Sequence, residues 1–339
     1  MLIASFDTKN EITLRLRSES MALLLREEDV HAVLTMSDTI KVVEEAFIDL
    51  AQDKATNRPR IRILEEHGVM HLLAASVPSM GTMGYKTYTV FRSGMRFVVM
   101  LFSTHDGHLL SIIESEWLGA MRTGATSAIA TNYLARPESS IVGLIGAGQQ
   151  AMIQLIGVCA VRKISQVNVY SRNLPVCEKF CEKMSRGLKI PVRPVANPRE
   201  AIEEADIVIT ATTSSTPVFP GEWLKAGCHI NAVGSNWANR RELDLTTLQR
   251  CDRIVTDSGE QARLEAGDLI IPAEEGLFDW NSVHDLADLV EGNIPYRQSA
   301  DEITLYKGVG IALEDIATAS LVYRLARERS LGSELNLLS

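Results

Sequence analysis

The stretch SSIVGLIGAGQQAMIQL, residues 139–155, decides the fold. An apolar run enters the pattern Gly-x-Gly-x-x-Ala at Gly146, Gly148 and Ala151, and apolar residues at helical spacing follow. This pattern predicts a buried strand, a tight turn and a helix. The first small residue makes the turn, the second lets the backbone approach a pyrophosphate, and the third lets helix and strand pack closely. Because the free N–H groups of the helix start then face phosphate, we predict a dinucleotide cradle rather than a plain turn.

Strands and helices continue to alternate beyond this stretch. The apolar segments IVGLIG, QVNVYS, DIVITAT, HINAVG and RIVTDS are separated by helix-like segments between residues 141 and 257. This order predicts a doubly wound parallel sheet of Rossmann type. Residues 58–115 instead contain five short β-rich runs separated by Gly or polar turns, which predict a mixed or meandering sheet. We read residues 304–329, TLYKGVGIALEDIATASLVYRLARER, as one long amphipathic helix.

Composition limits the class of partner. The chain has 339 residues, of which 46% are hydrophobic and 23% charged, as in soluble globular proteins. Its formal net charge of -9 gives no general reason to bind nucleic acid or an anionic membrane, so a small-molecule substrate is favoured. The five cysteines lack paired metal spacing, and the histidines form no ligand pattern, so we expect no metal. No secretory segment or long apolar run is present, and we expect a cytoplasmic protein.

The end of the second Rossmann strand bears on the choice of cofactor. A carboxylate at this position would bind the adenosine ribose of NAD, but the sequence there reads VYSRN. Ser171 and Arg172 supply a hydroxyl and a guanidinium, which suit a 2'-phosphate. We therefore predict a preference for NADP(H), with NAD(H) as the alternative.

Five ordered motifs resemble the ornithine cyclodeaminase and mu-crystallin family. They are MRTGATSAIATNYLA, GAGQQA, HINAVGSN with the later RRELD, EAGDL, and TLYKGVGIALEDIA, within residues 21–329. The resemblance implies a homodimer in which a Rossmann domain, residues 136–311, is inserted into a substrate-binding and dimerisation domain made of residues 21–135 and 312–339. Residues 1–20 would be an N-terminal extension, because a cleaner pattern begins at Met21. The family includes cyclodeaminases, amino-acid dehydrogenases, cyclic ketimine reductases and a hormone-binding crystallin, so the resemblance implies the fold more firmly than the reaction.

The chemistry shared by the enzymes of this family is hydride exchange at the carbon that bears an amino acid's nitrogen. Such a site needs cations for the carboxylate, a dry pocket and a group that handles a proton. Lys86 lies in a β-like run, and Arg122 lies at the start of a small-residue helix. An ordinary solvent-exposed charge is not expected at either position. The resemblance implies that these two cations and one further arginine hold the substrate carboxylate. Arg60 and Arg62 would point the same way on a strand, so both remain candidates for that arginine.

One residue departs from the family's pattern. Cyclodeaminases and several dehydrogenases have an aspartate at the end of the AVG strand, where this chain has Asn236. An amide can orient a substrate by hydrogen bonds but cannot exchange a proton as a carboxylate can. Lys86 is therefore our first candidate for the proton carrier, with Asp257 and Glu114 as alternatives.

The departure at Asn236 favours an NAD(P)H-dependent reductase of a small cyclic ketimine or related α-imino acid. Ornithine cyclodeaminase, which recycles NAD, is the first alternative, and a non-enzymatic NADPH-containing binding protein is the second. The resemblance also implies that the segment from Lys307 through Gly308 closes over the cofactor. The predicted cofactor contacts are Thr123, Gly146, Ala147, Gly148, Gln149, Gln150, Ser171, Arg172, Thr212, Val233, Gly234, Ser235, Lys307 and Gly308.

Overall fold

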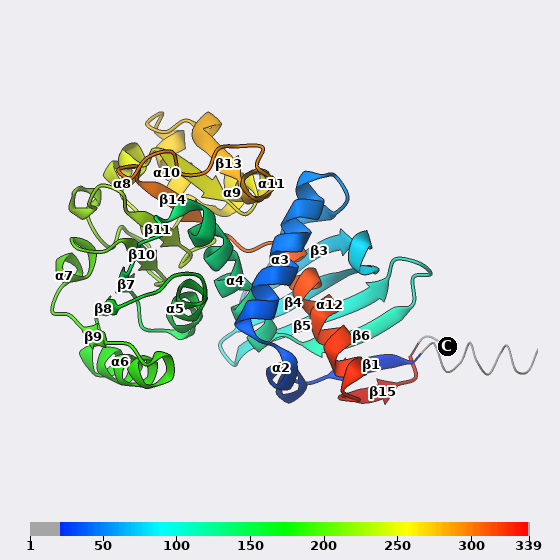
Figure 1. Cartoon of the computed structure of the whole chain (residues 1–339). Coiled ribbons are helices and arrows are strands. Elements are labelled where there is room, and N and C mark those ends of the chain that lie inside the picture. Colours follow the sequence, from blue (N-terminus) through cyan, green and yellow to red (C-terminus); the bar gives the residue numbers. More distant parts are fainter. Residues whose placement is uncertain (1–20, 338–339) are drawn as a thin grey trace, which may run out of the picture.

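The structure, a computed structural model, describes residues 21–337. The predicted extension, residues 1–20, lies outside the described residues. Two sheets organise the chain, and the long helix α4 runs between them (Figure 1). The predicted α/β class, with a Rossmann-like parallel sheet and a mixed sheet, is confirmed.

The first sheet is mixed and has seven strands in the order β15-β1-β6-β5-β4-β3-β2. Strands β2 to β6 pair with their sequence neighbours in antiparallel fashion, whereas β1 runs parallel to β6. The predicted meander therefore exists. Its strands are β1 (Ala22–Leu25), β2 (Thr56–Glu65), β3 (Gly68–Val77), β4 (Thr82–Phe91), β5 (Gly94–Ser103), β6 (Leu109–Glu114) and β15 (Ser333–Leu335).

Helices cover one face of this sheet and close its core. Alternate strand residues such as Leu73, Val99 and Ile113 are buried in one cluster with apolar residues of the covering helices. These elements are α2 (Glu27–Val33), α3 (Met36–Ala51), α4 (Glu116–Leu134) and α12 (Ala312–Glu328), together with the short 3-10 helix η1 (Pro78–Met80).

The second sheet is parallel throughout, with eight strands in the order β13-β12-β14-β11-β10-β7-β8-β9. Its strands are β7 (Ile141–Ile145), β8 (Gln166–Tyr170), β9 (Val192–Pro194), β10 (Ile207–Thr210), β11 (His229–Ala232), β12 (Arg253–Thr256), β13 (Val283–Asp285) and β14 (Thr304–Lys307). The remaining helical elements are α5 (Gln149–Val161), α6 (Leu174–Leu188), α7 (Pro198–Ile202), η2 (Gly221–Trp223), α8 (Leu245–Arg250), α9 (Gly259–Glu265), α10 (Gly267–Glu274), η3 (Trp280–Ser282) and α11 (Leu286–Glu291).

The prediction of one long amphipathic helix over residues 304–329 is wrong at its start and in its character. Residues Thr304–Lys307 form β14, which is inserted between β11 and β12, and the helix begins at Ala312. Every residue from Ala312 to Val322 is buried, because α12 packs on the mixed sheet and also contacts α3 and α4. The chain thus crosses from the parallel sheet to the mixed sheet over residues 308–311. We propose on this basis that residues 21–135 with 312–339 form one domain and residues 136–311 the other.

Candidate functional site

The glycine turn has the shape that a pyrophosphate requires. Gly146 has φ +121°, and a Cβ there would lie 2.4 Å from the carbonyl oxygen of Ala211, so only glycine fits. A Cβ at Gly148 would meet nothing within 4 Å, which leaves open space at the start of α5. Ala151 is fully buried in the core between α5 and the sheet. The residues present therefore fit a dinucleotide phosphate at the free N–H groups of the α5 N-terminus.

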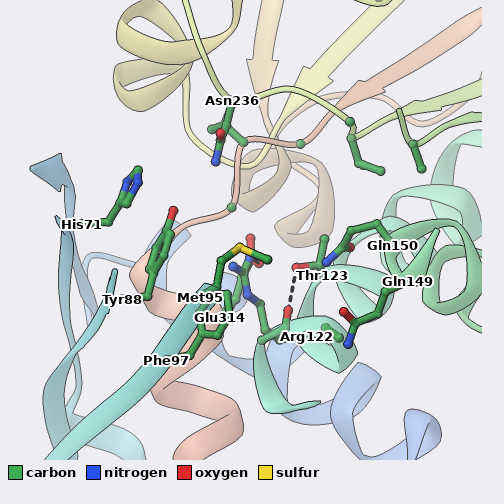
Figure 2. A pocket seen from close by; sticks show the side chains of 18 of the residues that line it. His71, Tyr88, Met95, Phe97, Arg122, Thr123, Gln149, Gln150, Asn236 and Glu314 are labelled. Atoms are coloured by element: carbon green, nitrogen blue, oxygen red, sulfur yellow. Dashed lines mark hydrogen bonds and ion pairs between the residues drawn. The ribbon is translucent and has the colours of Figure 1, made fainter. Parts of the chain in front are cut away.

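A cavity of about 540 Å³ lies beside this turn and is lined from both sheets. Figure 2 shows Thr123 and Gln150 on one side of it and His71 and Tyr88 on the other. Twelve of the predicted site residues line the cavity: Arg60, Lys86, Arg122, Thr123, Gly148, Gln149, Gln150, Thr212, Val233, Gly234, Asn236 and Gly308.

Lys86 is buried, with 3% of its side chain exposed. It lies on β4, between β3 and β5, so it is not an edge-strand lysine. Its Nζ is 2.8 Å from Oδ1 of Asp315 on α12. Burial lowers the pKa of Lys86 to about 8, although the Asp315 carboxylate opposes this shift. The ammonium group can therefore both attract an anion and give up a proton near neutral pH.

Arg122 shares Asp315 with Lys86. Its Nε is 3.0 Å from Oδ1 of Asp315, and its Nη1 is 2.7 Å from Oε2 of Glu314. Both carboxylates lie in the first turn of α12, which brings them to the N-terminal half of α4. The two candidate cations are thus held side by side by one short acidic pair.

Arg60 and Arg62 point the same way, as predicted, and bind the same carboxylate. Nη1 of Arg60 is 2.8 Å from Oε2 of Glu265, and Nη1 of Arg62 is 2.6 Å from Oε1. Arg60 lines the cavity. Arg62 instead donates to the backbone oxygen of Asn236 at 2.7 Å and stacks over the ring of Trp237 at 4.6 Å. The geometry therefore favours Arg60 for substrate contact and gives Arg62 a bridging position.

Asn236 follows β11 and lines the cavity, and Figure 2 shows its side chain facing the space between the two sheets.

The two alternative proton carriers, Asp257 and Glu114, lie in different parts of the structure. Asp257 lines the cavity, but its Oδ2 accepts the backbone N–H groups of Val309 at 2.9 Å and Gly310 at 2.5 Å. Glu114 is 3.1 Å from Arg26 and is not among the lining residues. The structure thus removes Glu114 from the candidates.

Six predicted cofactor residues do not line the cavity. Gly146 and Ala147 form the turn itself, and Ser171 and Arg172 follow β8 beside it, since Gly146 donates to the carbonyl of Tyr170 at 2.9 Å. The side chain of Lys307 is fully buried, with Nζ 2.9 Å from Oδ2 of Asp268 and 2.7 Å from the carbonyl oxygen of Ser235. The predicted contact of Lys307 with the cofactor is therefore not supported, because its buried ammonium group already pairs with Asp268 and donates to the Ser235 carbonyl.

The structure adds residues that sequence reasoning missed. The rings of His71 and Tyr88 stack with centroids 4.1 Å apart, and Trp237 meets His71 edge to face. Burial, with Arg60 and Arg62 nearby, lowers the pKa of His71 to about 3, so this imidazole is neutral. The register that sets His71 opposite Tyr88 is the signal that would have found this pair, and it needs the strand pairing itself. With Met95 and Phe97, these rings form an uncharged wall of the cavity.

The model of the ornithine cyclodeaminase/mu-crystallin family matches residues 20–330. This chain belongs to that family. The family's Delta(1)-pyrroline-2-carboxylate reductase from Bacillus cereus is 32% identical, over 92% of this chain and 99% of the relative. The Thermococcus litoralis Delta(1)-pyrroline-2-carboxylate reductase, solved with NADH and L-proline, is 38% identical with a TM-score of 0.88, covering 92% of this chain and 100% of that chain. An archaeal alanine dehydrogenase dimer with bound NAD is 30% identical with a TM-score of 0.89, covering 94% and 100%.

The comparisons confirm the predicted family, to which the five sequence motifs pointed. The lengths and polarity of the helices bear on whether the chain could span a membrane. Within residues 21–337, every helix is too short or too polar to cross a bilayer.

Proposed function

We propose that this chain is an NAD(P)H-dependent reductase of a small α-imino acid, with Δ1-pyrroline-2-carboxylate and similar cyclic ketimines as the preferred substrate class. The observation that carries this proposal is the joining of the Lys86 and Arg122 cations with the glycine turn around one cavity. Its relatives support the proposal, because they are named as a Δ1-pyrroline-2-carboxylate reductase and an alanine dehydrogenase. When bound, the reduced nicotinamide supplies the hydride.

The protein's own residues do the rest. Arg60, Lys86 and Arg122 bind and orient the carboxylate, and the Lys86 ammonium is the proton donor to the substrate nitrogen. The neutral wall of His71 and Tyr88 faces the rest of the substrate. An apolar ring suits such a wall better than a side chain with a second charge.

An assay panel tests the reaction type. We expect the protein to consume NADPH or NADH with Δ1-pyrroline-2-carboxylate or its six-membered homologue, and to release little ammonia from ornithine. Asn236→Asp should raise ornithine-dependent ammonia release, because the carboxylate restores a group that exchanges protons. Substantial conversion of ornithine to proline by the unaltered protein, without net cofactor consumption, would replace the reductase by the cyclodeaminase. Binding of NADPH with no turnover of any of these substrates would favour the non-enzymatic binder.

The cofactor is a nicotinamide dinucleotide, and we propose that NADPH is preferred. Arg172 is exposed directly after β8, where its guanidinium can reach a 2'-phosphate. Arg172→Ala should weaken NADPH binding by about 1.5 to 3 kcal/mol, since a charge-assisted contact is lost, and should leave NADH binding unchanged. Fluorescence titration of both cofactors measures this. Arg186→Ala, which removes an exposed arginine from α6, is the control, and equal affinities in the unaltered protein would contradict the assignment.

We also propose that the protein is a homodimer, assembled through the uncovered face of the mixed sheet. The register places Ile61 beside Leu72, and Tyr85 beside Met100 and then Ile112, all on the face opposite the helices. Ile61 is 59% exposed. Exposed apolar residues on an uncovered sheet face are typical of an interface between copies. The open face is the surface that favours association.

Sedimentation at micromolar concentration should therefore give a dimer. Ile61→Glu should weaken association about tenfold or more, because it places a charge on the apolar face. Leu264→Glu, on α9 and also 59% exposed, is the matched control and should leave the dimer unchanged. A monomeric parent would rule out the proposal.

A further inference from the structure

Glu314 differs from the other carboxylates that pair with the cavity's cations. It lines the cavity from the first turn of α12, with 1% of its side chain exposed. Its Oε2 is 2.7 Å from Nη1 of Arg122, while its Oε1 is buried without a hydrogen-bond partner in residues 21–337. One oxygen thus holds the cation, and the other is free to take a proton.

The neighbouring buried carboxylates either lie outside the cavity lining or are bound by backbone N–H groups. Asp315 and Glu265 also pair with cations, but neither lines the cavity. Asp257 lines it, but two backbone N–H groups bind its carboxylate. Among the cation partners that the structure describes, Glu314 is therefore the one that an entering anion would meet.

The buried and half-buried charges around the cavity balance before any substrate enters, while Glu116, which also lines the cavity, is exposed to solvent. Four cations face four carboxylates: Arg60, Arg62, Lys86 and Arg122 against Asp257, Glu265, Glu314 and Asp315. A substrate carboxylate adds a negative charge that the buried site cannot offset. An unpaired buried charge is costly, and the usual response is uptake of a proton by a nearby group.

We infer that Glu314 is an internal competitor for Arg122, which an entering substrate carboxylate displaces from the guanidinium while Glu314 binds a proton. This inference rests on the carboxylate clamp of the proposed function. Glu314 is on this view a positioning residue, which sets the pH range in which the clamp is open to substrate.

The surroundings of Glu314 support this role. Burial raises its pKa to about 7; the Arg122 cation opposes the shift, and the Asp257 and Asp315 carboxylates add to it. Tyr306 on β14 lines the same cavity as Glu314. Below pH 7 the group is mostly protonated and does not compete, whereas above pH 7 it ionises and holds Arg122. Anion affinity should therefore be level below about pH 7 and fall above it.

Cyclopentanecarboxylate tests this, because it carries the ring and the carboxylate but no nitrogen that titrates. We would measure its binding by calorimetry to the protein loaded with reduced cofactor, from pH 6 to pH 8. Affinity in the parent should fall by up to about tenfold between pH 7 and pH 8, as expected for one linked proton. Lys86, whose pKa is about 8, is half neutral at pH 8, so its titration adds a further loss of no more than about twofold within this range.

Glu314→Gln should reduce this pH dependence to the loss of about twofold that Lys86 contributes, and should bind the anion up to about tenfold more tightly than the parent at pH 8. A gain in affinity cannot arise from misfolding. Glu114→Gln, which removes a carboxylate outside the cavity, should keep the parent's profile. A parent profile that is level from pH 6 to pH 8, or an unchanged profile in Glu314→Gln, would overturn the inference while leaving the proposed function standing. Failure of the parent to bind at any pH would overturn the carboxylate clamp, and the inference with it.

Discussion

Lys86→Met should lower kcat/KM for cyclic ketimine reduction by at least about 100-fold to 1,000-fold. The substitution removes both the charge that orients the carboxylate and the proposed proton donor, and loss of one such group typically costs this much. NADPH affinity should be largely preserved, because the glycine turn that receives the phosphates lies on the parallel sheet. Steady-state kinetics and cofactor titration on the same preparation measure the two effects.

Lys41→Met is the control for this change, because Lys41 is exposed on α3. It should leave both quantities unchanged. Retention of more than about a tenth of the parent kcat/KM in Lys86→Met would show that Lys86 is not essential to the clamp or to proton transfer.

Lys307→Met should destabilise the fold by about 3 to 5 kcal/mol, the usual cost of leaving one member of a buried ion pair without its partner. Asp268 would keep its charge in the interior, where Lys307 and Asp268 are both 0% exposed. The same aspartate also accepts the backbone N–H groups of Glu242 and Leu243, so the damage should extend beyond the pair. Urea unfolding measures the change in the free energy of unfolding.

Arg324→Met provides the comparison. Arg324 pairs with Glu328 on α12, but both side chains are more than half exposed, so its loss should cost no more than about 1 kcal/mol. If Lys307→Met were as mild as Arg324→Met but weakened cofactor binding strongly, Lys307 would be a cofactor contact after all.

Local patterns in the sequence determined the framework of this protein. The strand, glycine turn and helix at 139–155 could be predicted because φ +121° at Gly146 excludes other residues and because apolar spacing distinguishes a strand from a helix. The five strands of the meander, and the strand order that led to a Rossmann sheet, came from the same periodicity and turn chemistry. The importance of Lys86 and Arg122 was also visible locally, since charged residues in apolar or small-residue segments need a buried partner.

The identity of those partners was decided only by the tertiary structure. Lys86 and Asp315 are 229 residues apart in sequence, and Arg60 and Glu265 are 205 apart. Likewise, the segment TLYK was taken as helix because its short apolar run is ambiguous by itself, and it became β14 because β11 and β12 offer it parallel pairing on both sides. The spacing of apolar residues in the sequence indicates which face of a helix or strand a side chain lies on. A buried charge is satisfied by whichever element packs against it, so its pairing follows from long-range packing rather than from local sequence.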